Sequence, residues 1–157
     1  MKTASAKEVR DELKHRSPAD LMKIILRLSR FKKENKELLT YLLFESDSEE
    51  SYVENVKELT VENLKNINHK TGYHQKKSVR KVLRELKKYI RYSGNKETEV
   101  ELLIHFCSIM RQEYPKLMRN RIIKDIVSRQ AIMARVRIST LHEDLQHDYE
   151  QELNLTE

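Results

Sequence analysis

Residues that interrupt helices are scarce in this chain, because its 157 residues include only two glycines and two prolines. Glycine and proline are the strongest helix breakers and the commonest turn residues. Between them, apolar residues recur at intervals of three and four, which is the spacing of an amphipathic helix, and no segment alternates as a strand does. The sequence therefore predicts an all-α fold, either a compact bundle or a short right-handed superhelix of six or seven helices.

The length is typical of one domain, so we expect a single all-helical domain over residues 1–157, with an acidic C-terminus at 148–157 that frays. Charged residues make up 36% of the chain, which suits helices with solvated outer faces. The one cysteine, Cys107, cannot form an internal disulfide, the N-terminus lacks a secretory signal, and no apolar run could span a bilayer. A cytoplasmic protein without membrane contact is expected.

Several helix boundaries follow from capping residues. Ser17 and Pro18 fit the start of a helix, which is followed by a single apolar stripe. Gly94 fits the end of the helix from about Tyr73 to Tyr92. The stretch 68–75 is the clearest loop. The stripe after Pro18 consists of Leu21, Ile24, Ile25, Leu28 and Phe31.

The C-terminal half is expected to contain a central helix and a long last helix. Residues 96–113 are apolar around most of a helical wheel, as in a helix surrounded by others. Pro115 begins a helix that reaches at least residue 138. Thr140 and Glu143 could form a capping box that breaks it, or the helix could continue toward residue 150. We favour continuation or a mild kink.

The strongest candidate binding surface is the basic face of residues 76–91, which holds eight cations against the single anion Glu85. Such a strip could neutralise several phosphates of a nucleic acid, with Tyr73, Tyr89 and Tyr92 available for stacking. A merely solvated helix face is the alternative, and the commoner one. The eight cations are Lys76, Lys77, Arg80, Lys81, Arg84, Lys87, Lys88 and Arg91. Arginines and Lys124 between residues 119 and 137 would extend this strip if their helix packs beside it.

Two acidic segments, residues 45–62 and 143–157, complement this basic face. Within one molecule they could lie against the basic helix and neutralise it. Between molecules they could orient a partner or a second copy. The sequence leaves both arrangements open, together with simple dispersal of charge over the surface.

No residue pattern predicts catalysis, a cofactor or a metal site, and we expect the protein not to be an enzyme. His69 with His74, and His142 with His147, are each five apart, a poor spacing for helical metal ligands. His105 lies between Glu101 and Ser108, where a carboxylate could orient and charge the ring. A histidine bonded at the edge of the core is the favoured interpretation. Cys107 is expected to be a small core residue.

The segments KKENKELLTYLLFE (32–45), KKYIRYSG (87–94) and TEVELL (98–103) resemble those of small uncharacterised all-helical bacterial proteins. The resemblance implies a helical, bacterial, cytoplasmic protein. It implies no activity, cofactor or functional residue.

The sequence thus favours a non-enzymatic helical module for protein–protein interaction, with an unidentified protein or a second copy as its partner. Pairing of protomers is expected to involve Ile132, Val136 and Ile138 of the last helix. The alternative is nonspecific nucleic-acid binding through the basic face.

Overall fold

The computed structural model describes residues 1–156, and every regular element within them is helical. The all-α prediction is confirmed. These residues form nine α-helices rather than six or seven, together with one π-helical turn, Tyr41–Glu45. The chain divides into two compact units, residues 1–44 and 45–157, and each is described by itself. Whether they form the single expected domain stays a prediction.

The first unit contains α1 (Ala6–Lys14), α2 (Pro18–Phe31) and α3 (Lys33–Thr40). Ser5 and Glu8 form a capping box at the start of α1. Ser17 caps α2 by accepting a hydrogen bond from the amide of Asp20, as its position before Pro18 predicts. The chain breaks at Lys32, whose backbone is extended, with φ −141° and ψ 149°.

No residue from 1 to 40 is buried, although this part of the chain is rich in large apolar side chains. The apolar stripe predicted after Pro18 lies on one side of α2, but most of its side chains are exposed. Phe31 is 77% exposed and Leu28 is 55% exposed. The periodicity correctly placed these side chains on one side of a helix, but periodicity carries no information about what covers that side.

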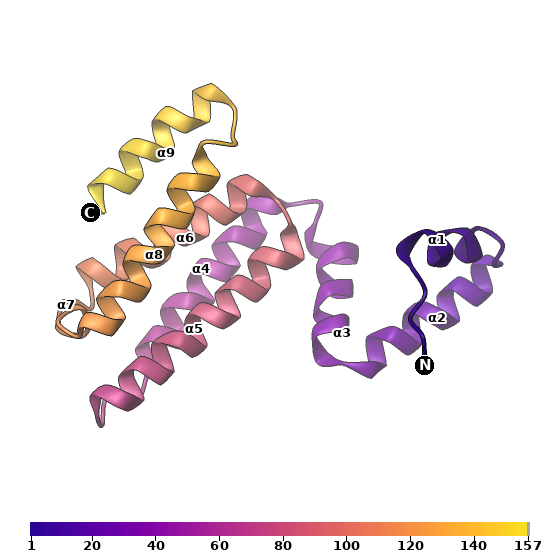
Figure 1. Ribbon diagram of the computed structural model, residues 1–157, viewed down its shortest axis with the longest axis horizontal. Helices are drawn as coiled ribbons and strands as arrows, with labels where there is room; N and C mark the ends of the chain where they lie inside the picture. Colours follow the sequence, from indigo (N-terminus) through magenta and orange to yellow (C-terminus); the bar gives the residue numbers. More distant parts are fainter. Residues whose placement is uncertain (157) are drawn as a thin grey trace. The chain divides into compact units, whose positions relative to one another are not determined.

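The second unit is a helical bundle of α4 (Glu49–Lys65), α5 (Gly72–Ser93), α6 (Lys96–Gln112), α7 (Pro115–Met118), α8 (Arg121–Ile138) and α9 (Glu143–Leu155). Helix α6 contacts each of the other five (Figure 1). Its side chains Leu102, Phe106, Cys107 and Met110 are fully buried. The prediction that residues 96–113 form a central helix is confirmed, because an apolar circumference requires neighbours on several sides.

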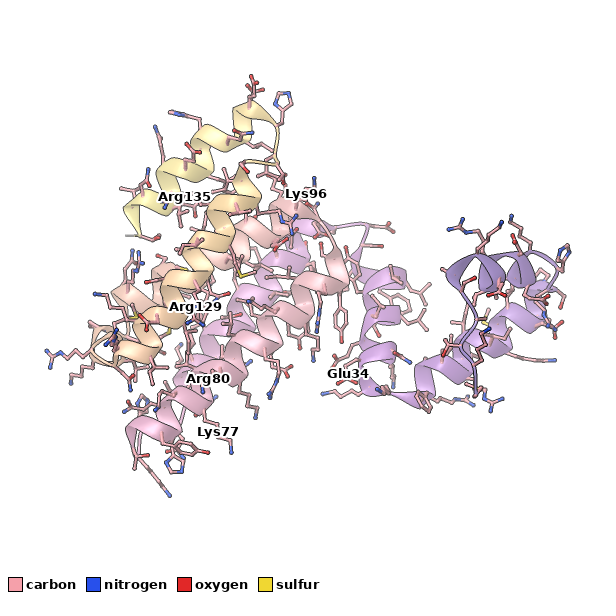
Figure 2. The ribbon with its side chains drawn as sticks, viewed as in Figure 1. Glu34, Lys77, Arg80, Lys96, Arg129 and Arg135 are labelled. Atoms are coloured by element: carbon pink, nitrogen blue, oxygen red, sulfur yellow. The ribbon has the colours of Figure 1, made fainter. Side chains whose placement is uncertain are left out.

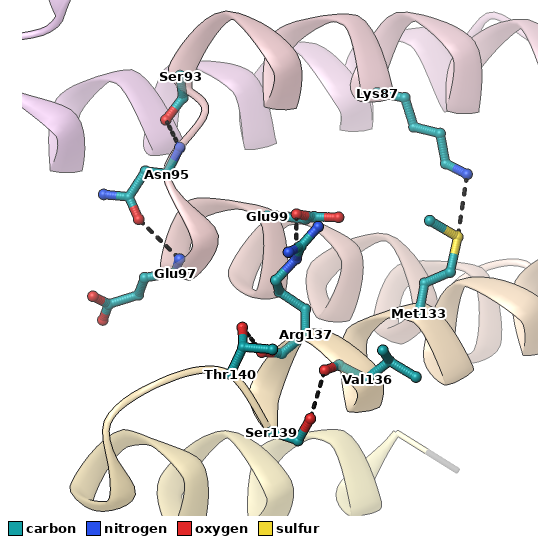
Figure 3. A network of polar contacts seen from close by, with 10 residues as sticks. All are labelled: Lys87, Ser93, Asn95, Glu97, Glu99, Met133, Val136, Arg137, Ser139 and Thr140. Carbon is teal, nitrogen blue, oxygen red and sulfur yellow. Dashed lines mark hydrogen bonds and ion pairs between the residues drawn. The ribbon is translucent and has the colours of Figure 1, made fainter.

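The turn between α5 and α6 forms as its sequence predicts. Gly94 ends α5 with φ 66°, a left-handed conformation that other residues adopt at a cost. The side-chain oxygen of Asn95 then caps α6 by accepting a hydrogen bond from the backbone amide of Glu97 at 2.8 Å. The backbone amide of Asn95 donates to Ser93 Oγ at 3.2 Å (Figure 3). Two polar side chains therefore satisfy the backbone where the chain reverses.

The expected continuation of the last helix through residue 140 is wrong. Helix α8 ends at Ile138, and the hydroxyls of Ser139 and Thr140 each donate to a carbonyl of its last turn at 2.8 Å. His142, rather than Thr140, caps α9. The helix expected from Pro115 is likewise interrupted, because Asn120 caps a new helix after the single turn of α7. Polar side chains of modest breaking strength thus end helices without glycine or proline.

Helix α9 remains regular to Leu155, and Leu153 is fully buried. Fraying was expected from residue 148 onward on the basis of acidic composition. Residue 157 lies outside the described residues.

Gln130→Met is expected to raise the free energy of unfolding by about 1 kcal/mol. Gln130 is only 4% exposed, and its Oε1 has no hydrogen-bond partner among residues 1–156. Its Nε2 donates to the carbonyl oxygen of Ile126 at 2.8 Å. That oxygen lies inside α8 and can accept the helical backbone hydrogen bond without the side chain of Gln130. Methionine keeps the shape and removes the unpaired acceptor. Urea unfolding measures the change, and a destabilised Met variant would contradict this account.

Candidate functional site

The basic face of α5 comprises the eight cations from Lys76 to Arg91, and the structure arranges them unequally. Five side chains project into solvent along the side of α5 opposite its buried residues, and Lys76, Lys87 and Lys88 are half-buried. Figure 2 shows Lys77 and Arg80 near the N-terminal end of α5. We call the five exposed cations the basic ridge: Lys77, Arg80, Lys81, Arg84 and Arg91.

Two of the half-buried cations, Lys87 and Lys88, are engaged by neighbours. Lys88 pairs with Glu85 at 2.8 Å, and its ammonium lies 4.9 Å from the centre of the Tyr89 ring. Lys87 approaches the sulfur of Met133 on α8 at 3.5 Å, and burial lowers the pKa of its ammonium (Figure 3). These contacts hold Lys87 and Lys88 against the protein, so they contribute less to an outward-facing cationic surface.

The basic ridge lacks an acidic partner within the described part of the chain. Among residues 1–156, no carboxylate forms an ion pair with any of its five side chains. A surface hollow of about 620 Å³ runs along its N-terminal part, where Tyr73, His74 and Asn68 join the cations. Exposed charges without partners are fully available to an external anion.

Neither acidic segment covers the ridge. The outer face of α4 carries Glu50, Glu54, Glu58 and Glu62, all exposed. Helix α9 contacts α8 and α6, where Tyr149 donates to Glu97 at 3.0 Å. The arrangement in which the acidic segments neutralise the basic helix of the same molecule is therefore not the one in this structure.

Helix α8 lies beside α5, as the extension of the basic face required. A Cβ placed at Gly72 would lie 3.5 Å from Asn120 Nδ2, and Lys87 meets Met133 further along, so the two helices run in the same direction. Two cations of α8 are nevertheless engaged by other helices. Arg137 pairs with Glu99 of α6 at 2.6 Å (Figure 3), and Arg135 donates to Asn154 of α9 at 3.2 Å. Arg119, Arg121, Lys124 and Arg129 remain exposed.

His105 does not receive the carboxylate expected from its own helix. Glu101 instead accepts a hydrogen bond from Lys57 of α4 at 2.6 Å, and Lys57 also pairs with Glu54 at 2.7 Å. Burial, followed by the charge of Lys57, lowers the pKa of His105, and its Nε2 has no hydrogen-bond partner among residues 1–156. His105 is half-buried and bonds the backbone of Lys57, in agreement with the favoured role of a histidine at the edge of the core. The alternative, in which Glu101 charges the ring, is not realised, because Lys57 pairs with Glu101 instead.

The stability of the fold is expected to fall as the pH drops below about 6.5, the ordinary pKa of histidine. The folded-state pKa of His105 is lower than this value, so the unfolded chain takes up the proton first and is favoured by acid. His105→Gln should flatten the decline between pH 7 and pH 5.5 in urea unfolding. Glu152, whose pKa burial raises, acts in the opposite direction and is unchanged in the variant. Equal pH slopes in the two proteins would contradict this assignment.

The side chains of His74 and His147 make local contacts, and Cys107 is a core residue. His74 Nδ1 lies 2.7 Å from the hydroxyl of Thr71 at the start of α5, and His147 lies 2.9 Å from Gln151. Cys107 is buried with its thiol directed to the carbonyl of Val127, which confirms the predicted core position. Across the described part of the chain, no group of three or more potential ligands gathers to hold a metal ion.

A second candidate surface, which was not predicted from the sequence, lies in residues 1–44. We call it the N-terminal apolar surface, and it consists of exposed apolar side chains of α2 and α3 together with Leu42 of the following turn. Within this surface, an uncharged groove of about 270 Å³ lies between α2 and α3. Its members are Met22, Ile24, Ile25, Leu26, Leu28, Phe31, Leu38 and Leu42.

A signal for this surface was present in the sequence. Met22 and Leu26 lie outside the expected stripe, and with them the apolar side chains of α2 cover about 220° of a helical wheel. That width exceeds what one neighbouring helix can bury. A wide apolar circumference also predicts the central helix at residues 96–113, and α2 shares this property.

Helix α8, which carries the three residues expected to pair protomers, offers less surface for pairing than expected. Ile132 and Val136 are 59% and 64% exposed, as the expectation of protomer pairing requires, but Ile138 is fully buried in the bundle. Its position at the end of α8 turns it toward the core, so Ile138 is removed from that candidate interface.

Comparison with known proteins adds no relative: no protein-family model, curated protein or solved structure matches this chain. Within residues 1–156, every helix is either too short or too polar to cross a bilayer.

Proposed function

We propose that the protein is a non-enzymatic helical interaction module that acts in the cytoplasm and binds a partner helix through the N-terminal apolar surface. The observation that carries this proposal is the exposure of α2, whose apolar side chains are 38–77% exposed from Met22 to Phe31. Together the members of the surface present on the order of 700 Å² of apolar area, above the 300–600 Å² of the largest patch on a typical monomer.

The groove between α2 and α3 suits a helical ligand. Its apolar walls come from Ile25 and Leu28 on one side and Leu38, Leu39 and Leu42 on the other. An amphipathic helix can insert apolar side chains at positions i, i+3 or i+4 into such a groove. Burial of these side chains supplies the free energy of binding, at roughly 25 cal/mol per Å² of apolar surface.

A photoreactive amino acid at Leu28 tests the proposal in the intact protein inside cells. Leu28 should form covalent adducts with a bound protein, whereas the same group at Arg27, on the polar side of α2, should form few. The matched pair differs by one residue, so general stickiness affects both positions alike. Equal adduct yields, or none at either position, would contradict binding through this surface.

A second candidate function, nonspecific nucleic-acid binding, rests on the basic ridge. Its five cations have no acidic partner within residues 1–156, and they recur along about 20 Å of α5. Phosphates recur along a duplex far more closely than this length, so several can be neutralised at once.

Charge reversal tests this second function. The triple variant Lys77→Glu, Arg80→Glu, Arg84→Glu is expected to abolish binding to a 20-base-pair duplex at low salt. The control is Lys2→Glu, Lys7→Glu, Arg10→Glu, which changes the net charge equally at exposed positions elsewhere. Equal losses in the two variants would show that net charge, rather than the ridge, governs binding.

A further inference from the structure

The N-terminal apolar surface has the properties of a surface that pairs with itself. It presents both a groove and projecting side chains that do not line the groove. The groove is lined by Ile25, Leu28, Leu38, Leu39 and Leu42, whereas Met22, Leu26 and Phe31 project beside it. An interface with two-fold symmetry requires a projection and a matching hollow on each copy.

The polar side-chain donors at the groove are already hydrogen-bonded within the protein. The two polar side chains that line the groove donate to backbone carbonyls: Asn35 Nδ2 bonds the carbonyl of Leu28 at 2.8 Å, and Ser29 Oγ bonds that of Leu26 at 2.9 Å. No charged side chain lines the groove. Removal of water from this surface therefore carries little of the polar desolvation cost that opposes association.

The exposed area matches the requirement of a dimer. A standard protein interface takes roughly 800 Å² from each partner, and the apolar side chains here present nearly that much. With no side chain buried before Tyr41, the three N-terminal helices lack a core that could hold them together. A partner must supply that core, and a second copy is present in equal amount wherever the chain is made.

We infer that the partner is a second copy of this chain, and that α2 and α3 of two protomers pack together as an apolar helical bundle. This inference rests on the proposed function and names its partner. Phe31, which is 77% exposed at the end of α2, is the side chain that enters the groove of the other copy. The groove volume of about 270 Å³ accommodates an aromatic ring.

The charges around the groove give this dimer a distinctive salt dependence. Between residues 20 and 37, six exposed cations stand against three acids, and two of the cations are paired: Lys23 with Asp20 at 3.8 Å and Lys33 with Glu37 at 3.3 Å. The segment keeps a net positive charge, so two copies bring like net charges near one another while their uncharged grooves meet. Salt screens this repulsion, so the dimer should tighten as salt rises, whereas binding of an acidic partner would weaken. The six cations are Lys23, Arg27, Arg30, Lys32, Lys33 and Lys36.

Sedimentation of the purified full-length chain tests the inference. A reversible dimer is expected at micromolar concentrations, with a Kd that falls between 50 and 500 mM sodium chloride. Leu28→Gln with Phe31→Gln should raise the Kd at least about a hundredfold, because two buried apolar side chains are lost while helix propensity is kept. The control, Lys23→Gln with Arg27→Gln, should lower the Kd at low salt by removing repulsion.

These outcomes distinguish a failure of the second copy as partner from a failure of the proposed function. A chain that stays monomeric at 100 μM, while the photoreactive group at Leu28 captures a different protein in cells, overturns the second copy but retains the proposed function. A monomer whose α2 amides are protected from hydrogen exchange overturns both. A dimer that the Leu28 and Phe31 changes leave intact, or one that weakens with salt, places the interface elsewhere. Wild-type salt dependence decides the matter even if the double variant misfolds.

Discussion

Phe106→Ala is expected to lower the free energy of unfolding by about 3–5 kcal/mol. Phe106 is fully buried in α6, the helix that contacts α4, α5, α7, α8 and α9. Its loss removes apolar burial and leaves a cavity that neighbours on five sides cannot all move to fill. A loss this large is comparable with the whole stability of many domains, so the variant should be partly unfolded at 37 °C.

Urea unfolding followed by circular dichroism at 222 nm measures this effect. Phe44→Ala is the matched control, because Phe44 is the same residue type at 77% exposure. We expect the control to change stability by no more than about 0.5 kcal/mol. Similar losses in the two variants would mean that α6 is not the centre of the bundle.

The affinity of the basic ridge for duplex DNA is expected to fall about 500-fold between 50 and 200 mM salt. Each neutralised phosphate contributes about −0.9 to the slope of log K against log salt, and five cations are free to make such contacts. A fourfold rise in salt then lowers the affinity by nearly three orders of magnitude. This steepness comes from released counterions, so base sequence should have little influence.

Fluorescence anisotropy with two duplexes of unrelated sequence measures both properties. The slope should be equal for the two duplexes. A variant with Arg91→Gln alone should show a slope smaller by about one, since it removes a single phosphate contact. A shallow slope near −1 would mean that the ridge does not track a phosphate backbone. Undetectable binding at 50 mM salt would reject this second function altogether.

Much of the local structure could be predicted because it depends on neighbours in sequence. Ser17 before Pro18 and Gly94 after Ser93 fix helix ends through bonds made within one turn. The cations of α5 also share a face because of helical geometry alone. Both the all-α class and the composition of the basic face follow from such short-range rules.

The features that escaped prediction depend on contacts between distant segments. Lys57 and Glu101 are 44 residues apart, and their pairing leaves His105 without its expected carboxylate. The exposure of α2 is a similar case. The apolar stripe of α2 indicates that burial would be favourable. The local sequence pattern does not indicate which surface, if any, covers it. The break after Ile138 was missed for a different reason, because Ser139 and Thr140 are weak breakers that succeed only when their hydroxyls bond the preceding turn.

The spacing of its cations makes the electric field along the basic ridge uneven. Lys77, Arg80, Lys81 and Arg84 lie within about two turns of one another, whereas Arg91 alone lies near Gly94. The positive dipole ends of the parallel helices α5 and α8 lie near Gly72, and the antiparallel α4 and α6 bring negative ends to the same region, so these dipoles oppose one another. The side chains therefore set the gradient, and an approaching polyanion is drawn first to the Lys77 end.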